Sequence, residues 1–137
     1  MATTGRLILG VFVALIITLG LGFAWGASGR MGLQASLDDA RRDYDLAEGR
    51  AQILDARVSL YNNNFGDASR RLEEAKATLR RVRERYQEAG RNDAASSIDA
   101  ALMLLEEAQR LAGKLDPAAN SKAGEALESI KVASAKS

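Results

Sequence analysis

The sequence contains no cysteine and no histidine. Without cysteine the chain forms no disulfide and carries out no thiol chemistry, and without histidine it lacks the common nucleophile-base pairs of enzymes. Zinc sites, the Glu-x-x-His di-iron pattern of helical bundles and imidazole ligation of haem or a chlorophyll-type pigment are excluded for the same reason. We therefore expect a protein that is not an enzyme and that holds no cofactor and no metal.

Proline and aromatic residues are scarce as well, with one Pro, one Trp, three Tyr and three Phe. Alanine, leucine, glutamate and arginine dominate instead, as they do in helix-rich chains. The 19 basic and 18 acidic residues nearly cancel, so the net charge of +1 gives no reason to expect nucleic acid as a ligand. No glycine-rich phosphate loop is present either. The composition predicts an all-α protein that binds neither nucleic acid nor a small-molecule substrate.

One long apolar run stands near the N-terminus, from Leu7 to Trp25, and contains no charged residue. Its length is close to the roughly 20 apolar residues that cross a bilayer core. We predict a short tail (1–6), a transmembrane helix (7–26) and a flexible linker (27–35). The alternative is a cleaved signal peptide, because a short basic lead precedes the run and small residues flank Trp25. The run is longer than the 7–15 apolar residues usual in signal peptides, which favours a retained anchor.

The flanks of this run suggest how it would sit in a membrane. Trp25 suits the membrane-water interface and Arg30 suits the lipid headgroups, so both are predicted interface anchors. Lys and Arg are nearly balanced across the run, and orientation therefore depends on the leader, which resembles an export signal. We expect a single-pass protein with its N-terminus in the cytoplasm and its helical domain extracytoplasmic or periplasmic.

Small residues recur at every fourth position of the predicted anchor. They are Gly10, Ala14, Thr18, Gly22 and Gly26. Such a row lets two helix backbones approach closely, although glycine and alanine are also common in membrane helices generally. We predict that this row packs against another membrane helix. The anchor has no ionisable side chain, which disfavours a transporter or channel.

The rest of the chain, residues 36–135, is predicted to form one helical domain. Apolar residues in its first half recur at alternating steps of four and three, the 3.5-residue spacing of coiled-coil packing. Around the first predicted helix, 36–61, they are Leu33, Leu37, Ala40, Tyr44, Ala47, Ala51, Leu54, Val58 and Tyr61. In the second, 65–89, they are Phe65, Ala68, Leu72, Ala75, Leu79, Val82, Tyr86 and Ala89. We expect these matching sets to form an antiparallel helical hairpin.

A second hairpin is predicted from helices over 93–113 and 117–133, the latter starting at Asp116 and Pro117. The apolar residues of the third helix are Ile98, Ala101, Leu105, Ala108, Ala112 and Leu115, broadened by Leu102, Leu104 and Leu111. The fourth helix has a thin stripe of Ala123, Leu127, Ile130 and Ala133 or Ser134. The predicted fold is one N-terminal transmembrane helix followed by an antiparallel bundle of four helices.

The stretch NNFGDASRRLEEAKATL, which follows the first helix, resembles the second half of a tetratricopeptide repeat. The resemblance covers residues 52–79. It places Phe65, Ala68, Leu72 and Ala75 at the usual packing positions, with Ala56 at the small position of the preceding helix. It implies a helical hairpin that binds other proteins.

A basic run, RRVRERYQ, lies in the second predicted helix. One interpretation is that its charges pair with acidic neighbours inside the bundle. The other is contact with a partner protein or with anionic headgroups, through Arg80, Arg81, Arg83 and Arg85.

Together these features predict a non-catalytic, membrane-anchored accessory or scaffold subunit that stabilises a larger membrane protein complex. Its partners would be the lipid bilayer and the other subunits of that complex. Two alternatives remain: a membrane-tethered adaptor that recruits soluble proteins, and an exported helical binding protein with a cleaved signal.

Overall fold

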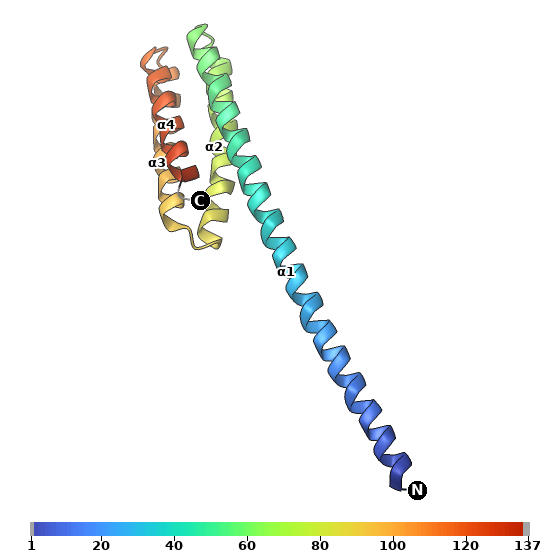
Figure 1. Cartoon of the computed structure of the whole chain (residues 1–137). Coiled ribbons are helices and arrows are strands. Elements are labelled where there is room, and N and C mark those ends of the chain that lie inside the picture. The colour runs from blue at the N-terminus through green and yellow to red at the C-terminus, as the bar shows by residue number, and fades with distance from the viewer. Residues whose placement is uncertain (1, 136–137) are drawn as a thin grey trace. The chain divides into compact units, whose positions relative to one another are not determined.

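The computed structural model describes the backbone of residues 2–135 and the side chains of residues 32–135. Within this part of the chain there are four helices: α1 (Ala2–Tyr61), α2 (Phe65–Glu88), α3 (Asn92–Ala112) and α4 (Ala118–Ala135) (Figure 1). By its internal contacts the chain divides into two compact units, Met1–Ala40 and Arg41–Ser137. The second unit combines the C-terminal part of α1 with α2, α3 and α4. The prediction of an all-α antiparallel bundle is confirmed for the described residues.

The turns between the helices follow local sequence signals. Asn63 takes the left-handed conformation with φ of 57°, and the Oδ1 of Asn64 accepts a hydrogen bond of 3.2 Å from the Asp67 backbone N–H at the start of α2. Gly90 has φ of 72° and separates α2 from α3, a position where the absence of a Cβ matters. Before α4, the Oδ1 of Asp116 accepts a hydrogen bond of 2.9 Å from the Ala118 backbone N–H. Each turn between two helices therefore contains a residue suited either to its backbone conformation or to capping the next helix.

Residues 27–35, for which a flexible linker was expected, are helical and continue α1. The stretch contains no proline, so no backbone N–H is missing from the helix. Ser36, the first residue of the predicted helix 36–61, donates its hydroxyl to the Gly32 carbonyl four residues earlier at 3.0 Å. That bond is typical of a serine inside a helix.

The predicted membrane anchor, 7–26, lies outside the residues whose side chains the structure describes. The same holds for its packing row and for Trp25 and Arg30. Among the residues that the structure describes in full, no helix has both the length and the apolar character needed to span a membrane.

The core of the bundle uses the predicted face of α2 but not the predicted face of α1. On α2 the buried apolar residues are Ala68, Leu72, Ala75, Leu79, Val82 and Tyr86, as expected. On α1 they are Leu46, Gly49, Ile53, Ala56 and Leu60. All nine residues predicted to line the hairpin on α1, from Leu33 to Tyr61, are exposed. The hairpin prediction was correct, and the face assigned to α1 was wrong.

Side-chain size explains why α1 packs on α2 through this face and not through the predicted one. Gly49 faces α2, and a Cβ placed there would lie 3.0 Å from Cδ2 of Leu79. Ala56 is fully buried on the same side. Glycine and alanine bring the backbone of α1 close to α2, whereas Tyr44 and Tyr61 on the opposite face would hold the two helices apart.

The second hairpin buries mostly alanines, together with a few larger aliphatic residues. On α3 the fully or nearly fully buried residues include Ile98, Ala101, Leu105, Ala108 and Ala112. On α4 they are Ala119, Ala123, Ala126, Ile130 and Ala133. Leu115, which was expected in the stripe of the third helix, instead lies beyond the end of α3 with φ of 57° and is exposed. The helix ends at Ala112, three residues before Leu115, because Gly113 and Lys114 already belong to the turn.

The glycines of the two turn regions provide a test of this backbone geometry. Gly90→Ala is expected to lower the free energy of unfolding by about 1 kcal/mol, because alanine is strained at φ of 72°. Gly66→Ala is expected to raise it by about 0.5 kcal/mol, because Gly66 lies in the first turn of α2 with open space around its Cα. Urea denaturation of the full chain measures both. Equal effects of the two substitutions would contradict the assigned turn.

Candidate functional site

An apolar face of α1 is left uncovered by the bundle. We call it the outer face and define it by six exposed residues of the second unit: Tyr44, Ala47, Ala51, Leu54, Val58 and Tyr61. Among them Tyr44 is 69% exposed, Leu54 is 51% exposed, Val58 is 60% exposed and Tyr61 is 82% exposed. Their spacing of three and four keeps them on one side of the helix, away from the side that carries Ile53 and Ala56.

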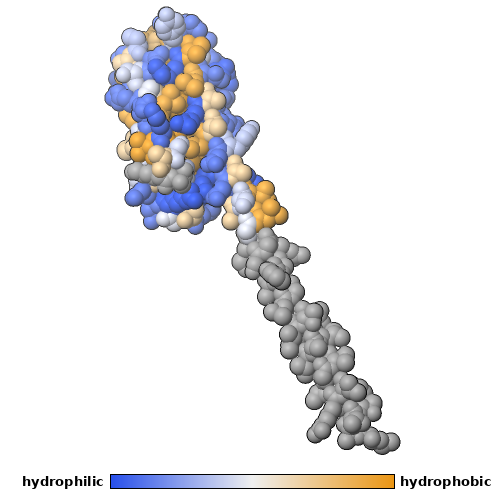
Figure 2. Space-filling model, in the orientation of Figure 1, coloured by the Kyte–Doolittle hydropathy of each residue, from blue (hydrophilic) through white to orange (hydrophobic). Residues whose placement is uncertain are grey.

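This degree of exposure is unusual for large apolar residues that share one helix face. Single exposed leucines need no explanation, but contiguous apolar surface rimmed by polar residues marks interaction sites. Figure 2 shows apolar surface, in orange and tan, running between polar regions in blue on the visible side of the bundle. In the sequence the same spacing continues toward the N-terminus through Leu37 and Leu33, which are also exposed.

A hollow of about 330 Å³ adjoins the C-terminal end of the outer face, between α1 and α4. It is lined by Leu54, Arg57, Val58, Tyr61 and Asn120. The Arg57 Nε donates to the Asn120 Oδ1 at 2.8 Å, and the Asn120 Nδ2 donates to the Arg57 carbonyl at 3.2 Å. This reciprocal pair joins α1 to α4 and gives the hollow one rigid polar wall beside its apolar ones.

On the other flank of the outer face, a network centred on Asp67 joins α1 to α2. The Ser59 hydroxyl donates to Asp67 at 2.6 Å, and the guanidinium groups of Arg70 and Arg71 donate to the same carboxylate at 2.6 and 2.8 Å. Arg71 also reaches Asp55 on α1 at 3.0 Å. The hydrogen bond from Ser59, followed by those from Arg71 and Arg70, holds the pKa of Asp67 well below its ordinary value of 3.8. The network fixes the rotation of α1 about its axis.

Near the start of the second unit, two further contacts fix α1 against α2. The Arg85 Nη1 lies 2.7 Å from the Asp45 Oδ2. The guanidinium of Arg42, almost fully buried, lies 5.3 Å from the centroid of the Tyr86 ring, within the range of a cation-π contact. Because both contacts use the inner side of α1, they leave the outer face free of intramolecular partners in the described residues.

The four arginines of the basic run are distributed over different contacts. Arg83 pairs with Asp99 on α3 at 3.2 Å and Arg85 pairs with Asp45 on α1. Arg80 lies 3.7 Å from Glu73, and Arg81 donates to the Thr78 hydroxyl at 3.3 Å. Charge pairing between neighbouring helices is therefore part of the bundle. Contact of these four arginines with a partner or with headgroups stays a prediction.

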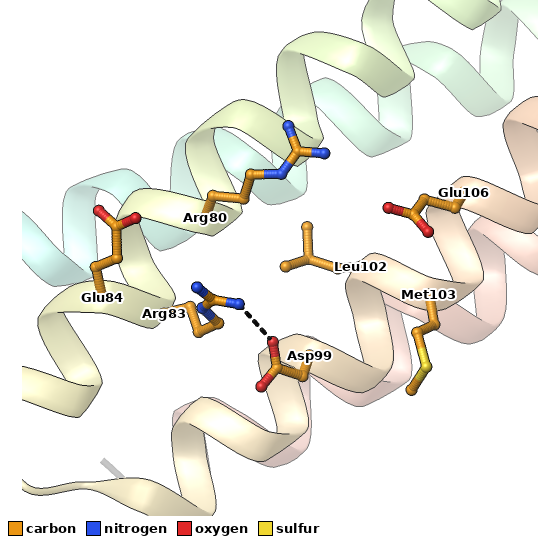
Figure 3. A pocket seen from close by; sticks show the side chains of 7 residues that line it. All are labelled: Arg80, Arg83, Glu84, Asp99, Leu102, Met103 and Glu106. Carbon is orange, nitrogen blue, oxygen red and sulfur yellow. Dashed lines mark hydrogen bonds and ion pairs between the residues drawn. The ribbon is translucent and has the colours of Figure 1, made fainter.

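A second hollow, of about 420 Å³, lies between α2 and α3. It is lined by Arg80, Arg83 and Glu84 of α2 and by Asp99, Leu102, Met103 and Glu106 of α3, which are labelled in Figure 3. Its rim carries charges of both signs, and the Arg83–Asp99 pair bridges it (Figure 3). No cluster of three carboxylates that could hold a metal ion occurs among the described residues.

The outer face is the most distinctive of these features. The sequence identified its residues but placed them inside the hairpin. The signal that could have corrected this is a second set at the same 3.5-residue spacing, Leu46, Gly49, Ile53, Ala56 and Leu60. A helix with two apolar faces at the same spacing can bury either of them in a hairpin, so the sequence pattern did not select the buried face.

The Asp67 network predicts a pH dependence of stability. Because the folded-state pKa of Asp67 lies below its unfolded value of 3.8, the carboxylate stabilises the fold above that pH and loses this contribution as the pH falls further. Asp67→Asn is therefore expected to lower the free energy of unfolding at pH 7, with the difference from the wild type shrinking below about pH 4. Denaturation curves between pH 7 and pH 2 measure it. A difference that does not vary with pH would contradict the ionised network, and Glu128→Gln serves as the exposed control.

Comparisons with known proteins do not identify the chain: no family model matches it, and neither a curated protein nor a solved structure is detectably similar to it.

Proposed function

We propose that this chain is a non-catalytic scaffold subunit, anchored in a membrane by residues 7–26, whose helical bundle contacts neighbouring proteins. The observation that carries the proposal is the outer face of α1, with Leu54, Val58 and Tyr61 more than half exposed on one side of the helix. Aromatic and aliphatic side chains that share a rigid surface are typical anchors of protein interfaces.

Two further features support a structural role. The bundle is held by polar contacts on both sides of the outer face, Arg57 with Asn120 and Ser59 with Asp67, so this surface is presented on a fixed frame. A preformed surface loses little conformational entropy on binding. The tetratricopeptide-like stretch 52–79 also includes part of this face, which fits a helical hairpin that binds proteins.

The membrane part of the proposal depends on the sequence. The uncharged run from Leu7 to Trp25 would place the protein in a bilayer, with the N-terminus cytoplasmic and the bundle extracytoplasmic or periplasmic. The row from Gly10 to Gly26 would pack against a membrane helix of a neighbouring subunit. The anchor and the outer face would then be two separate contacts with the same complex.

Affinity purification of the full chain from its native membranes in mild detergent tests the proposal. We expect partners that stay bound through extraction. Leu54→Glu with Val58→Glu is expected to reduce their recovery at least tenfold, because each substitution removes an apolar side chain worth about 1.5 kcal/mol or more when buried. Gly22→Leu with Gly26→Leu is expected to act in the same direction by blocking close approach of the anchor.

The matched control is Val132→Glu, which places the same charge at an exposed apolar position of α4. It should leave recovery unchanged, and circular dichroism should show equal helix content in all variants. Partners that leave during extraction would instead indicate an adaptor. A mature chain that begins after Gly26, seen by mass spectrometry, would indicate an exported binding protein.

A further inference from the structure

We propose that the outer face of α1 binds an amphipathic helix of a neighbouring protein, and that two acidic residues of that helix, seven positions apart, pair with Arg50 and Arg57. This inference rests on the proposed function, which takes the outer face as a protein contact, and it adds the chemistry that the partner must carry. All residues on which it depends lie in the second unit, Arg41–Ser137.

The spacing of the outer face favours a helix as the partner. Its six residues follow steps of three and four from Tyr44 to Tyr61. This is the spacing of the a and d positions, between which a second helix inserts its own side chains. The backbone N–H and C=O groups of α1 are bonded within the helix, so a strand could not pair with them. An amphipathic helix, which binds through apolar side chains one turn apart, fits this surface.

Charge determines the sign that the partner must carry. Arg50 and Arg57 are seven residues apart, so they share one flank of the outer face, the flank on which Arg57 contacts α4. Both residues are partly buried, and among the described residues neither forms an ion pair with a carboxylate. On the opposite flank the charges are balanced within the bundle, because Arg71 contacts both Asp55 and Asp67. The α4 flank therefore offers two positive charges to a partner.

Arg57 is held in a position suited to a carboxylate. Its Nε donates to the Asn120 Oδ1 at 2.8 Å. Its guanidinium lies beside the α4 backbone at Gly124, where an added Cβ would be 3.5 Å from the Arg57 Cζ. Within the described part of the chain, Nη1 and Nη2 have no hydrogen-bond partner. These two groups can bind both oxygens of one carboxylate, and because the side chain is already ordered, pairing costs little conformational entropy.

The hollow beside Arg57 gives an apolar side chain of the partner a place next to the carboxylate. Leu54, Val58 and Tyr61 form its apolar walls, while Arg57 and Asn120 form its polar wall. Residues three or four positions apart on a helix are neighbours on its surface. A partner helix with an acidic residue one turn from an apolar residue would therefore contact both kinds of wall at once.

The charged residues of the α4 flank predict a pattern in the partner. In order along α1 they are Asp43, Arg50 and Arg57, at intervals of seven. When two helices pack at this repeat, flanking residues seven apart on one lie beside flanking residues seven apart on the other, whichever way the helices run. A second copy of this chain in parallel register would instead set Asp43 beside Glu48 of that copy, which are like charges. The observations therefore favour a different protein with two acidic residues at this interval.

Zero-length cross-linking in native membranes tests the pairing. Arg50→Lys and Arg57→Lys are introduced separately into the full chain, and a carbodiimide joins the lysine amine to a carboxylate in contact with it. We expect each variant to form a new cross-link to an Asp or Glu of one partner, the two acidic residues being seven positions apart by mass spectrometry. Arg91→Lys is the matched control, because Arg91 is also partly buried and also without a carboxylate partner among the described residues, but lies before α3.

A cross-link from position 50 or 57 to a second copy of this chain, or to a lipid carboxylate, would overturn the proposal. So would the absence, at either position, of a protein cross-link above the Arg91→Lys background. Cross-linked acidic residues at an interval other than seven would contradict a helix packed along the outer face.

Charge reversal separates this inference from the proposed function. Arg50→Glu is expected to lower recovery of the partner from native membranes about tenfold, because an opposite-charge pair becomes a like-charge pair. Among the described residues Arg50 has no side-chain hydrogen bond or ion pair, so the free energy of unfolding should not change. Arg91→Glu should leave recovery unchanged.

The two proposals fail in different ways. If Leu54→Glu with Val58→Glu lowers recovery but Arg50→Glu does not, the outer face remains a contact and the acidic helix is rejected. If neither change lowers recovery, the outer face is not the contact and the proposed function fails with it.

Discussion

The close approach of α1 to α2 is the constraint on which the rest of the structure depends. Gly49 lies so close to Leu79 that an added Cβ would come within 3.0 Å of the Leu79 Cδ2, and Ala56 is fully buried on the same side. Small residues at these two positions let the backbones of the helices come together, so the larger Leu46, Ile53 and Leu60 can fill the core beside them. Once this side of α1 faces inward, the tyrosines of the other side must face outward.

Polar contacts hold α1 in this orientation about its own axis. Ser59 and Asp55 engage α2 through Asp67 and Arg71, while Arg57 engages α4 through Asn120. These contacts lie on opposite flanks of the outer face, so rotating α1 in either direction would break one set. The exposed apolar surface is therefore maintained by specific hydrogen bonds, and it differs in this respect from a loosely packed helix.

The functional proposals follow from this geometry. The bundle covers one side of residues 41–61 of α1 and leaves the apolar outer face exposed, which is why we propose that this face contacts a neighbouring protein. A scaffold role needs no catalytic group, which agrees with a chain that lacks histidine and cysteine.

The sequence by itself determined the helical class, the approximate extent of each helix and the residues of the turns, because these depend on local propensities at Asn63, Gly90 and Asp116. It also identified the buried face of α2, which is the one apolar face of that helix. It did not determine which of two apolar faces of α1 would be buried, since both have the same 3.5-residue spacing. That choice depends on how closely two helices approach and on contacts such as Arg57 with Asn120, 63 residues apart in the chain. Only the tertiary structure brings such residues together, and so it alone decided which apolar face of α1 stays exposed.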